Sequence, residues 1–273
     1  MATASAPRRK RGGLRRGTLT PDRIVTESLR LLDTGGVAGF SMPKLGRALG
    51  ADPTAVYRHF ASKDDLVLAI ADRLIQEAID GLPAHDCWVE TVIDSTRRLR
   101  RTYLAHPAAA SLSSFRTTGR PAEMRVVDRT LEAVMAAGYE GLQAAVIYRA
   151  LGDFALAWCG SEASLLALPE PLQAVDRGVW TQAYRAVGQE EYPHIWRVRD
   201  ELPLVADDDI FEAVLAIMVT GICERAPRPC TCGTHPGGAA PDLRYSRPQF
   251  QKLSTEPVDG LCINRWTSTV LCG

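Results

Sequence analysis

The sequence lacks the features that mark membrane-spanning, secreted and many catalytic proteins. No uncharged apolar run reaches about 18 residues, so we expect no transmembrane helix and no membrane partner. The basic start has no apolar segment behind it, so we expect no secretory signal and a cytoplasmic protein. There is no glycine-rich phosphate loop, no Gly-x-Ser-x-Gly and no His-Glu-x-x-His, and histidine and cysteine are scattered. We therefore expect neither enzymatic activity nor a cofactor.

Net charge is also missing, although its distribution is uneven. Over 273 residues, 32 Lys and Arg balance 32 Asp and Glu. Residues 1–63 hold twelve basic and four acidic residues, whereas the remainder is acidic by the same margin. A basic head on an acidic body indicates a polyanionic partner for the N-terminal part. Residues 1–18 form a basic arm that we expect to be flexible. Two roles stay open for it: residues 8–16 lie in a minor groove of a nucleic acid, or its charges only add non-specific affinity.

Strand-like alternation and internal repeats are absent, whereas apolar residues recur at helical spacing over most of the chain. Glycine, proline and capping residues divide this pattern into segments. Helices are expected at 21–33, 42–49, 54–60, 63–80, 87–105, 121–137, 141–167, 172–187 and 208–224. The pattern therefore predicts an all-α chain.

Residues 226–273 differ in composition, being rich in proline and glycine and without periodicity. We expect a mostly unstructured tail. Within it, Cys230-x-Cys232-x-x-His235 offers three zinc ligands, and Cys223 is a conceivable fourth. The spacing matches no strong zinc-finger pattern, so we expect no metal site. Cys87 and Cys159 lie inside helical patterns and are expected to be small core residues.

The stretch 41–60, SMPKLGRALGADPTAVYRHF, carries the most specific pattern in the chain. Leu45, Leu49 and Val56 are spaced to pack two short helices across a turn at Gly50. A helix-turn-helix places its second helix in the major groove of DNA, with polar or small residues on the outer face. The outer face of this second helix offers Pro53, Thr54, Ala55, Arg58 and His59.

This segment resembles the DNA-binding domain of TetR/AcrR-type transcriptional regulators over about residues 20–70. The matching residues are Gly36 to Ser41, Leu45-Gly46-x-x-Leu49-Gly50, Val56-Tyr57-x-His59-Phe60 and Ser62-Lys63-x-x-Leu66. Over 86–224 the similarity is one of helix number and length. The resemblance implies an N-terminal three-helix helix-turn-helix DNA-binding domain at 19–66. It implies a larger helical ligand-binding and dimerisation domain at 67–225, between the arm 1–18 and the tail 226–273.

The resemblance also implies roles for individual residues in the predicted DNA-binding domain, which we call the head. Tyr57 and His59 are expected to contact phosphates, together with Ser41 and Lys63 at helix N-termini. Base reading falls to Arg58, which suits guanine, and to Thr54, which suits a thymine methyl or a base edge. Pro53, Ala55 and Lys44 complete the predicted DNA-binding surface. As alternatives, Tyr57 is only a packed aromatic residue, and Lys44 with Arg47 is only a solvated face.

For the body, the resemblance implies a small molecule bound between helices and a homodimer made by the last long helices. The strongly apolar segment 208–224 fits such an interface, with ordinary core as the alternative. Small residues at Gly152, Ala157 and Gly160 allow close helix approach. The candidate ligand residues are Tyr103, His106, Phe115, Arg149, Asp153 and Trp158. Alternatively, Arg149 and Asp153 satisfy each other, and His106 only ends a helix. No histidine cluster supports a metal–tetracycline chelate as ligand.

Together these observations predict a homodimeric, sequence-specific transcriptional repressor. Its partners are expected to be a palindromic operator in double-stranded DNA, a second copy of itself and an unidentified small-molecule effector that releases it from DNA. Two alternatives stay open: an activator with the same DNA-binding head, and a regulator that acts mainly through protein contacts.

Overall fold

The computed structural model describes residues 19–228 and residue 230. These residues belong to one compact unit, Met1–Pro241, and a second unit, Asp242–Gly273, lies outside the described residues. The predicted flexible arm at 1–18 also falls outside them, as do residues 229 and 231–273 of the predicted tail at 226–273. The described start of that tail is not unstructured as predicted, because Pro227 and Arg228 contact the body at Ala137 and Gly138.

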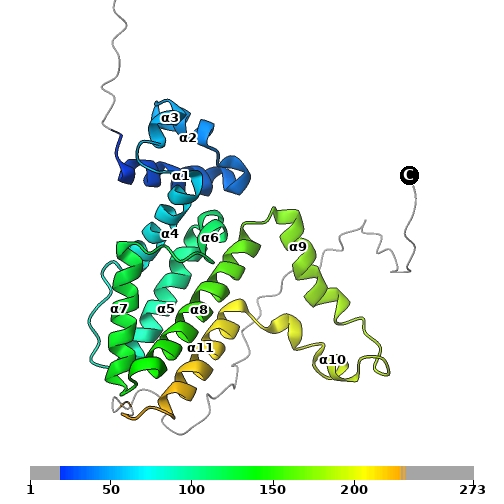
Figure 1. Cartoon of the computed structure of the whole chain (residues 1–273). Coiled ribbons are helices and arrows are strands. Elements are labelled where there is room, and N and C mark those ends of the chain that lie inside the picture. Colours follow the sequence, from blue (N-terminus) through cyan, green and yellow to red (C-terminus); the bar gives the residue numbers. More distant parts are fainter. Residues whose placement is uncertain (1–18, 229, 231–273) are drawn as a thin grey trace, which may run out of the picture. The chain divides into compact units, whose positions relative to one another are not determined.

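The described part of the chain is built from helices and contains no strand, which confirms the predicted all-α class (Figure 1). No helix among the described residues is both long and apolar enough to cross a membrane. The α-helices are α1 Pro21–Gly39, α2 Met42–Leu49, α3 Pro53–Val56, α4 Lys63–Ile79, α5 Trp88–Ala105, α6 Pro107–Ser113, α7 Pro121–Ala136, α8 Gly141–Leu166, α9 Glu170–Gly178, α10 Pro193–Val198 and α11 Asp207–Cys223. A π-helical segment, η1 Val179–Ala183, and a 3-10 segment, η2 Leu202–Leu204, accompany them.

The first helix begins and ends as its sequence predicts. Thr20 accepts a hydrogen bond from the backbone N–H of Arg23 at 3.2 Å, and Pro21 occupies the first helical position. Gly36 has a φ of 60° and a ψ of −172°, which are not helical, so the regular helix stops there as the glycines predicted. The bounds of α1 extend to Gly39 because they include a second, short helical stretch that follows this break.

Helices α2 and α3 form the predicted helix-turn-helix. Leu45, Leu49 and Val56 are buried between them, and Gly50 closes α2 in the left-handed conformation with a φ of 63°. The third helix is shorter than the predicted 54–60, because regular α-helix ends at Val56 and residues 57–59 form a turn. Phe60 is buried after this turn and anchors the chain before α4 begins.

The body consists of α4, α5, α7 and α8 packed against one another, with α6 against α1, α4 and α8 (Figure 1). Helix α6 was missed from the sequence, because His106-Pro107 was taken as a simple break between helices. Its core-facing residues are alanines, three of which (108–110) are buried, and such a short run gives little periodic signal. Small side chains let α6 lie close to its neighbours.

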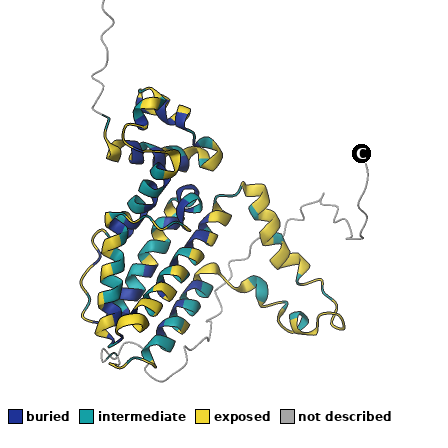
Figure 2. Cartoon of the chain, in the orientation of Figure 1, coloured by how far each residue is buried: buried dark blue, intermediate teal, exposed yellow. Residues whose placement is uncertain are grey.

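Residues 170–204 hold four short elements: α9, η1, α10 and η2. No residue of these elements is buried (Figure 2). The helix predicted at 172–187 is present as α9, which runs without a break into the π-helical η1. Elements α10 and η2 were not predicted. We call residues 170–204 the exposed segment of the body. Its apolar side chains, including Leu172, Val175 and Trp180, are largely exposed in the isolated chain.

Helix α11 uses one face for the core and leaves another exposed. Phe211, Leu215 and Val219 are buried, whereas Ile217 is 52% exposed. The core interpretation therefore holds for the buried face, and a subunit interface on the exposed face stays a prediction. Cys87 and Cys159 are buried, as their positions in helical patterns predicted.

The turn of the helix-turn-helix depends on a glycine at position 46. A Cβ atom built on Gly46 would lie 2.9 Å from Pro53 Cγ, so α2 and α3 approach too closely for a side chain here. We expect Gly46→Ala to lower the free energy of unfolding by about 1–3 kcal/mol in urea titrations. The matched control is Gly35→Ala, whose Cβ would meet nothing within 4 Å. Equal stability of the two variants would contradict this account.

Candidate nucleic-acid interface and ligand cavity

Each residue predicted to bind DNA is at least partly exposed to solvent. Lys44, Thr54, Arg58, His59 and Lys63 are exposed, and Tyr57 is 47% exposed. Ser41, Pro53 and Ala55 are partly exposed beside them. The exposure of Tyr57 argues against its alternative role as a packed aromatic residue. The arrangement presents cations, hydroxyl groups and an imidazole to solvent on adjacent turns, as a phosphate backbone requires.

Asp52 fixes the start of the predicted reading helix. Its carboxylate accepts hydrogen bonds from the Thr54 backbone N–H at 2.8 Å and from the Thr54 hydroxyl at 2.7 Å. These hydrogen bonds lower the pKa of the Asp52 carboxyl below its usual value. Since the Thr54 hydroxyl donates its proton to Asp52, the methyl group and the acceptor lone pairs of that hydroxyl are left for a base. An N-cap aspartate before proline was the available signal.

The N-terminus of α4 combines a serine cap, a lysine and two aspartates that are paired with arginines. Ser62 caps the helix by accepting from the Asp65 backbone N–H at 3.0 Å, and Lys63 follows as its first residue. The two acids of the first turn are both paired: Asp64 with Arg116 at 2.5 Å and Asp65 with Arg120 at 2.5 Å. The arginines thereby offset negative charge that would otherwise oppose a phosphate at this helix end.

His106 joins the head to the body and does not face a cavity. Its Nδ1 lies 3.0 Å from the Asp33 carboxylate on α1, and its Nε2 lies 3.3 Å from Glu77 on α4. The residue also stands at the junction of α5 and α6, so it does end a helix as the alternative proposed. Its imidazole thus connects α1, α4 and the α5–α6 junction at one point.

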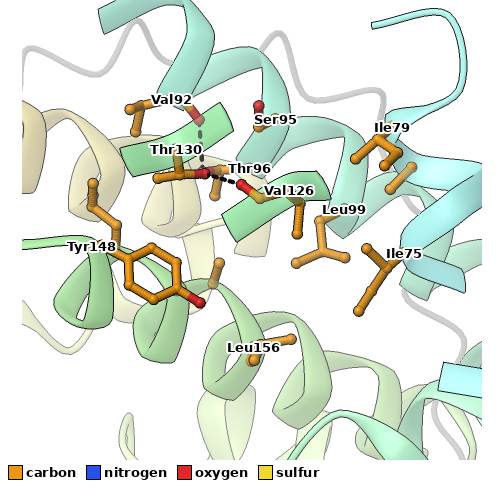
Figure 3. A pocket seen from close by; sticks show the side chains of 14 residues that line it. Ile75, Ile79, Val92, Ser95, Thr96, Leu99, Val126, Thr130, Tyr148 and Leu156 are labelled. Carbon is orange, nitrogen blue, oxygen red and sulfur yellow. Dashed lines mark hydrogen bonds between the residues drawn. The ribbon is translucent and has the colours of Figure 1, made fainter. Parts of the chain in front are cut away.

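A cavity lies between α4, α5, α7 and α8 (Figure 3). Its volume is about 80 Å³, so a small-molecule ligand of ordinary size would fill it and extend through its open side. The lining is mostly aliphatic and includes no charged side chain. The lining residues are Ile75, Ala78, Ile79, Val92, Ser95, Thr96, Leu99, Val126, Thr130, Tyr148, Leu151, Gly152, Ala155 and Leu156.

The polar groups of the cavity are hydroxyls, and most of their protons are already used. Ser95, Thr96 and Thr130 each donate to a backbone carbonyl one turn earlier, at 2.6, 2.8 and 2.7 Å. Tyr148 differs, because its ring lies along the cavity wall and its hydroxyl points inward (Figure 3). Burial raises the pKa of Tyr148, so the phenol stays neutral and keeps its proton at neutral pH. The cavity therefore suits an apolar, uncharged ligand with a hydrogen-bond acceptor.

The structure does not bring the six predicted ligand residues together. Tyr103 is buried in the core, Phe115 is 76% exposed after α6, and Arg149 pairs with Asp153 at 2.9 Å on the surface of α8. Only Trp158 borders a described depression, a groove of about 420 Å³ shared with Phe154, Leu165 and Asp207. None of the six lines the cavity of Figure 3. Their ligand-binding role stays a prediction.

Sequence reasoning missed Tyr148, although a signal for it exists. Tyr148 precedes Gly152 by one helical turn, and a Cβ on Gly152 would lie 3.8 Å from its ring. A tyrosine stacked over a glycine on an apolar helix leaves room beside the ring for another molecule. Gly160 confirms the expected close helix approach in a different place, since its Cβ would overlap Ser114 at the end of α6.

Two family models match the chain. The model described as "Bacterial regulatory proteins, tetR family" matches residues 24–70, and "Tetracyclin repressor-like, C-terminal domain" matches residues 81–226. Among curated proteins, HTH-type transcriptional repressor Rv1353c of Mycobacterium tuberculosis is 29% identical over 138 residues, half of this chain and 52% of the relative. The chain thus spans about half the length of the first curated relatives that it matches.

Two solved structures extend the comparison to ligands and DNA. ActR from Streptomyces coelicolor in complex with actinorhodin has a TM-score of 0.66 and 25% identity, covering 77% of this chain and 97% of ActR. BioQ with its natural double-stranded DNA operator has a TM-score of 0.50 and 29% identity, covering 59% of this chain and 98% of BioQ.

The cavity can be tested by filling it from its glycine. We expect Gly152→Phe to abolish binding of the apolar dye Nile red, because the ring would occupy the space beside Tyr148. The matched control Gly152→Ala adds only a methyl group at ordinary contact distance and should keep the dye affinity within about threefold. Fluorescence titration measures both. Equal dye binding by the phenylalanine variant would place the dye elsewhere.

Proposed function

The chain belongs to the TetR family of bacterial regulatory proteins, and on this basis we propose that it is a homodimeric transcriptional repressor released from its operator by a small apolar ligand. The observation that supports this most directly is the position of α4. Its N-cap residue Ser62 and its first residue Lys63 belong to the proposed DNA-binding surface, and Ile75, Ala78 and Ile79 in its last turns line the cavity. Because the partner is DNA, we place the protein in the cytoplasm.

In the proposed complex, phosphate contacts fix the register of each head on the duplex. Tyr57, His59 and Lys63 supply them with the exposed N-terminus of α2 at Ser41. Arg58 reads guanine O6 and N7 in the major groove, and the Thr54 methyl contacts a thymine. Pro53, Ala55 and Lys44 border this contact. Two heads bind successive grooves about 34–36 Å apart, which favours a palindromic operator.

Ligand control follows from two connections between cavity and head. Helix α4 is one, and the second is α6, which packs against α1 and α4 on one side and α8 on the other. A ligand that pushes α4 or α8 outward changes the angle at which each head leaves the body. It regulates DNA binding only if it prefers the state in which the spacing of the heads no longer fits the operator.

The dimer is proposed to form through α8 and α11, with the exposed segment 170–204 as an additional contact. Both helices expose large apolar residues that the isolated chain leaves uncovered, among them Leu142, Val146 and Ile217. Exposed apolar surface shared by neighbouring helices is typical of subunit interfaces. Tyr148 and Gly152 lie on α8 as well, so the proposed interface adjoins the helix that walls the cavity.

The DNA-binding assignment is tested by separating readout from charge. We expect Arg58→Ala to relax the base preference at one position of each half-site by about 10–100-fold. Tyr57→Phe should instead weaken binding to every DNA sequence by about 2–10-fold, since it removes one phosphate hydrogen bond. Selection from genomic fragments and footprinting at two salt concentrations measure both effects, and Arg101→Ala on α5 serves as control.

A single protected palindrome for the unaltered protein supports the proposal. Diffuse, salt-sensitive binding without a footprint contradicts it and favours a regulator that acts through protein contacts. An unchanged operator preference in Arg58→Ala would remove that residue from base reading. Increased transcription from the bound promoter would identify an activator.

The dimer is tested by placing a charge on the proposed interface. We expect Ile217→Arg to convert the protein to a monomer in size-exclusion chromatography with light scattering, because a buried unpaired charge opposes association. Met124→Arg on α7 is the matched control, since Met124 is similarly exposed, at 57%, on another helix. A dimer that tolerates Ile217→Arg, or a monomeric parent protein, would contradict the proposed interface.

A further inference from the structure

Two cysteines far apart in the sequence meet at the end of the body opposite the head. Cys87 is the N-cap residue of α5, and Cys230 lies beyond the end of α11. Their Sγ atoms are 2.9 Å apart, although 143 residues separate them in the chain. The sulfur atoms of a disulfide lie about 2.05 Å apart, so a movement of about 0.9 Å would bring this pair to bonding distance.

Specific contacts hold the segment that carries Cys230 against the body. The backbone N–H of Arg228 donates to the Ala137 carbonyl at 2.9 Å, and the Tyr139 hydroxyl donates to the Ile222 carbonyl at 2.7 Å. Gly138 has a φ of 91°, and a Cβ there would lie 2.9 Å from Pro227 Cβ. The segment 226–228 is therefore seated closely on the turn between α7 and α8, which positions Cys230 at Cys87.

We propose that Cys87 and Cys230 form a reversible disulfide when the protein meets a hydroperoxide. Cys230 is partly exposed and Cys87 is 7% exposed, so Cys230 is the sulfur that the oxidant reaches. The Cys230 thiolate attacks the peroxide, the O–O bond breaks, and a sulfenic acid and an alcohol or water result. The sulfur of Cys87 then attacks the sulfenic sulfur and forms the S–S bond. The hydroxide of the sulfenic acid takes the Cys87 thiol proton and leaves as water. Two thiols have then lost two electrons to the peroxide.

The same reaction is unfavourable at Cys159. This thiol is fully buried on α8, and burial raises the pKa of Cys159 to about 12. A thiol of such high pKa is almost entirely protonated at neutral pH and is a poor nucleophile. Selectivity for the Cys87–Cys230 pair thus follows from its partial exposure and from the second sulfur already in place.

The disulfide would connect a wall of the cavity to the end of the proposed dimer helix. Helix α5 supplies Val92, Ser95 and Thr96 to the cavity, and Cys230 follows α11 by a few residues. Closing so long a loop restricts the unfolded chain strongly, and we expect the oxidised protein to melt roughly 5–15 °C higher. In a reducing cytoplasm such a bond is transient, which suits a sensor and not a permanent staple.

The test treats the reduced, purified full chain with stoichiometric hydrogen peroxide. Intact mass spectrometry should show the loss of two hydrogens, and non-reducing peptide mapping should find Cys87 linked to Cys230. The variants Cys87→Ser and Cys230→Ser should lose this linked peptide and the rise in melting temperature. Serine is a preferred N-cap residue, so Cys87→Ser is expected to fold. Cys232→Ser is the matched control and should keep both properties.

Three results would overturn the proposal. Linkage of Cys230 to Cys232 would show that the nearer sequence neighbour resolves the sulfenic acid. A disulfide between two chains would assign the thiols to an intermolecular contact. Stoichiometric zinc in the purified protein, released only when Cys87 or Cys230 is replaced, would make them metal ligands instead.

Discussion

The continuity of α4 is the constraint on which the rest of the structure depends. One helix of 17 residues begins at the capped, cationic end of the head and finishes in the wall of the cavity. Leu66, Ile70 and Leu74 are buried along it, so neither end can shift without disturbing a core. A helix is stiff over this length, and a displacement at Ile79 is therefore carried to Lys63. The head and the cavity share one mechanical element.

Paired charges hold this element at both sides. Asp64 and Asp65 are bound by arginines from the loop before α7, and Arg73 pairs with Asp22 on α1. These pairs are partly exposed, so each contributes little stability. Their effect is on geometry, because each joins α4 to another part of the chain, and the bidentate Arg116–Asp64 contact also fixes the direction of both side chains. The body thus determines the position of the helix end at which the proposed phosphate lies.

Local sequence signals were enough for the head, and long-range packing decided the cavity. Thr20, Ser41 and Gly50 mark helix ends through their own backbone preferences, so the helix-turn-helix could be predicted. The cavity requires Ile75, Thr96, Val126 and Tyr148 to meet from four helices, and no local pattern contains that information. His106 illustrates the limit, since its partners Asp33 and Glu77 are distant in the sequence. The helix α6 that it begins has too few large apolar residues to be periodic.

The exposed segment 170–204 makes the local stability of this protein depend on its concentration. Residues 170–204 bury no side chain within their own chain, so ordering them lowers conformational entropy with little apolar burial in return. Formation of the proposed dimer would bury the apolar side chains of this exposed segment. Its protection against proteases would then rise with protein concentration, and on dilution this segment would open first. In a cell that makes few copies of this protein, proteolysis would therefore shorten the lifetime of each molecule.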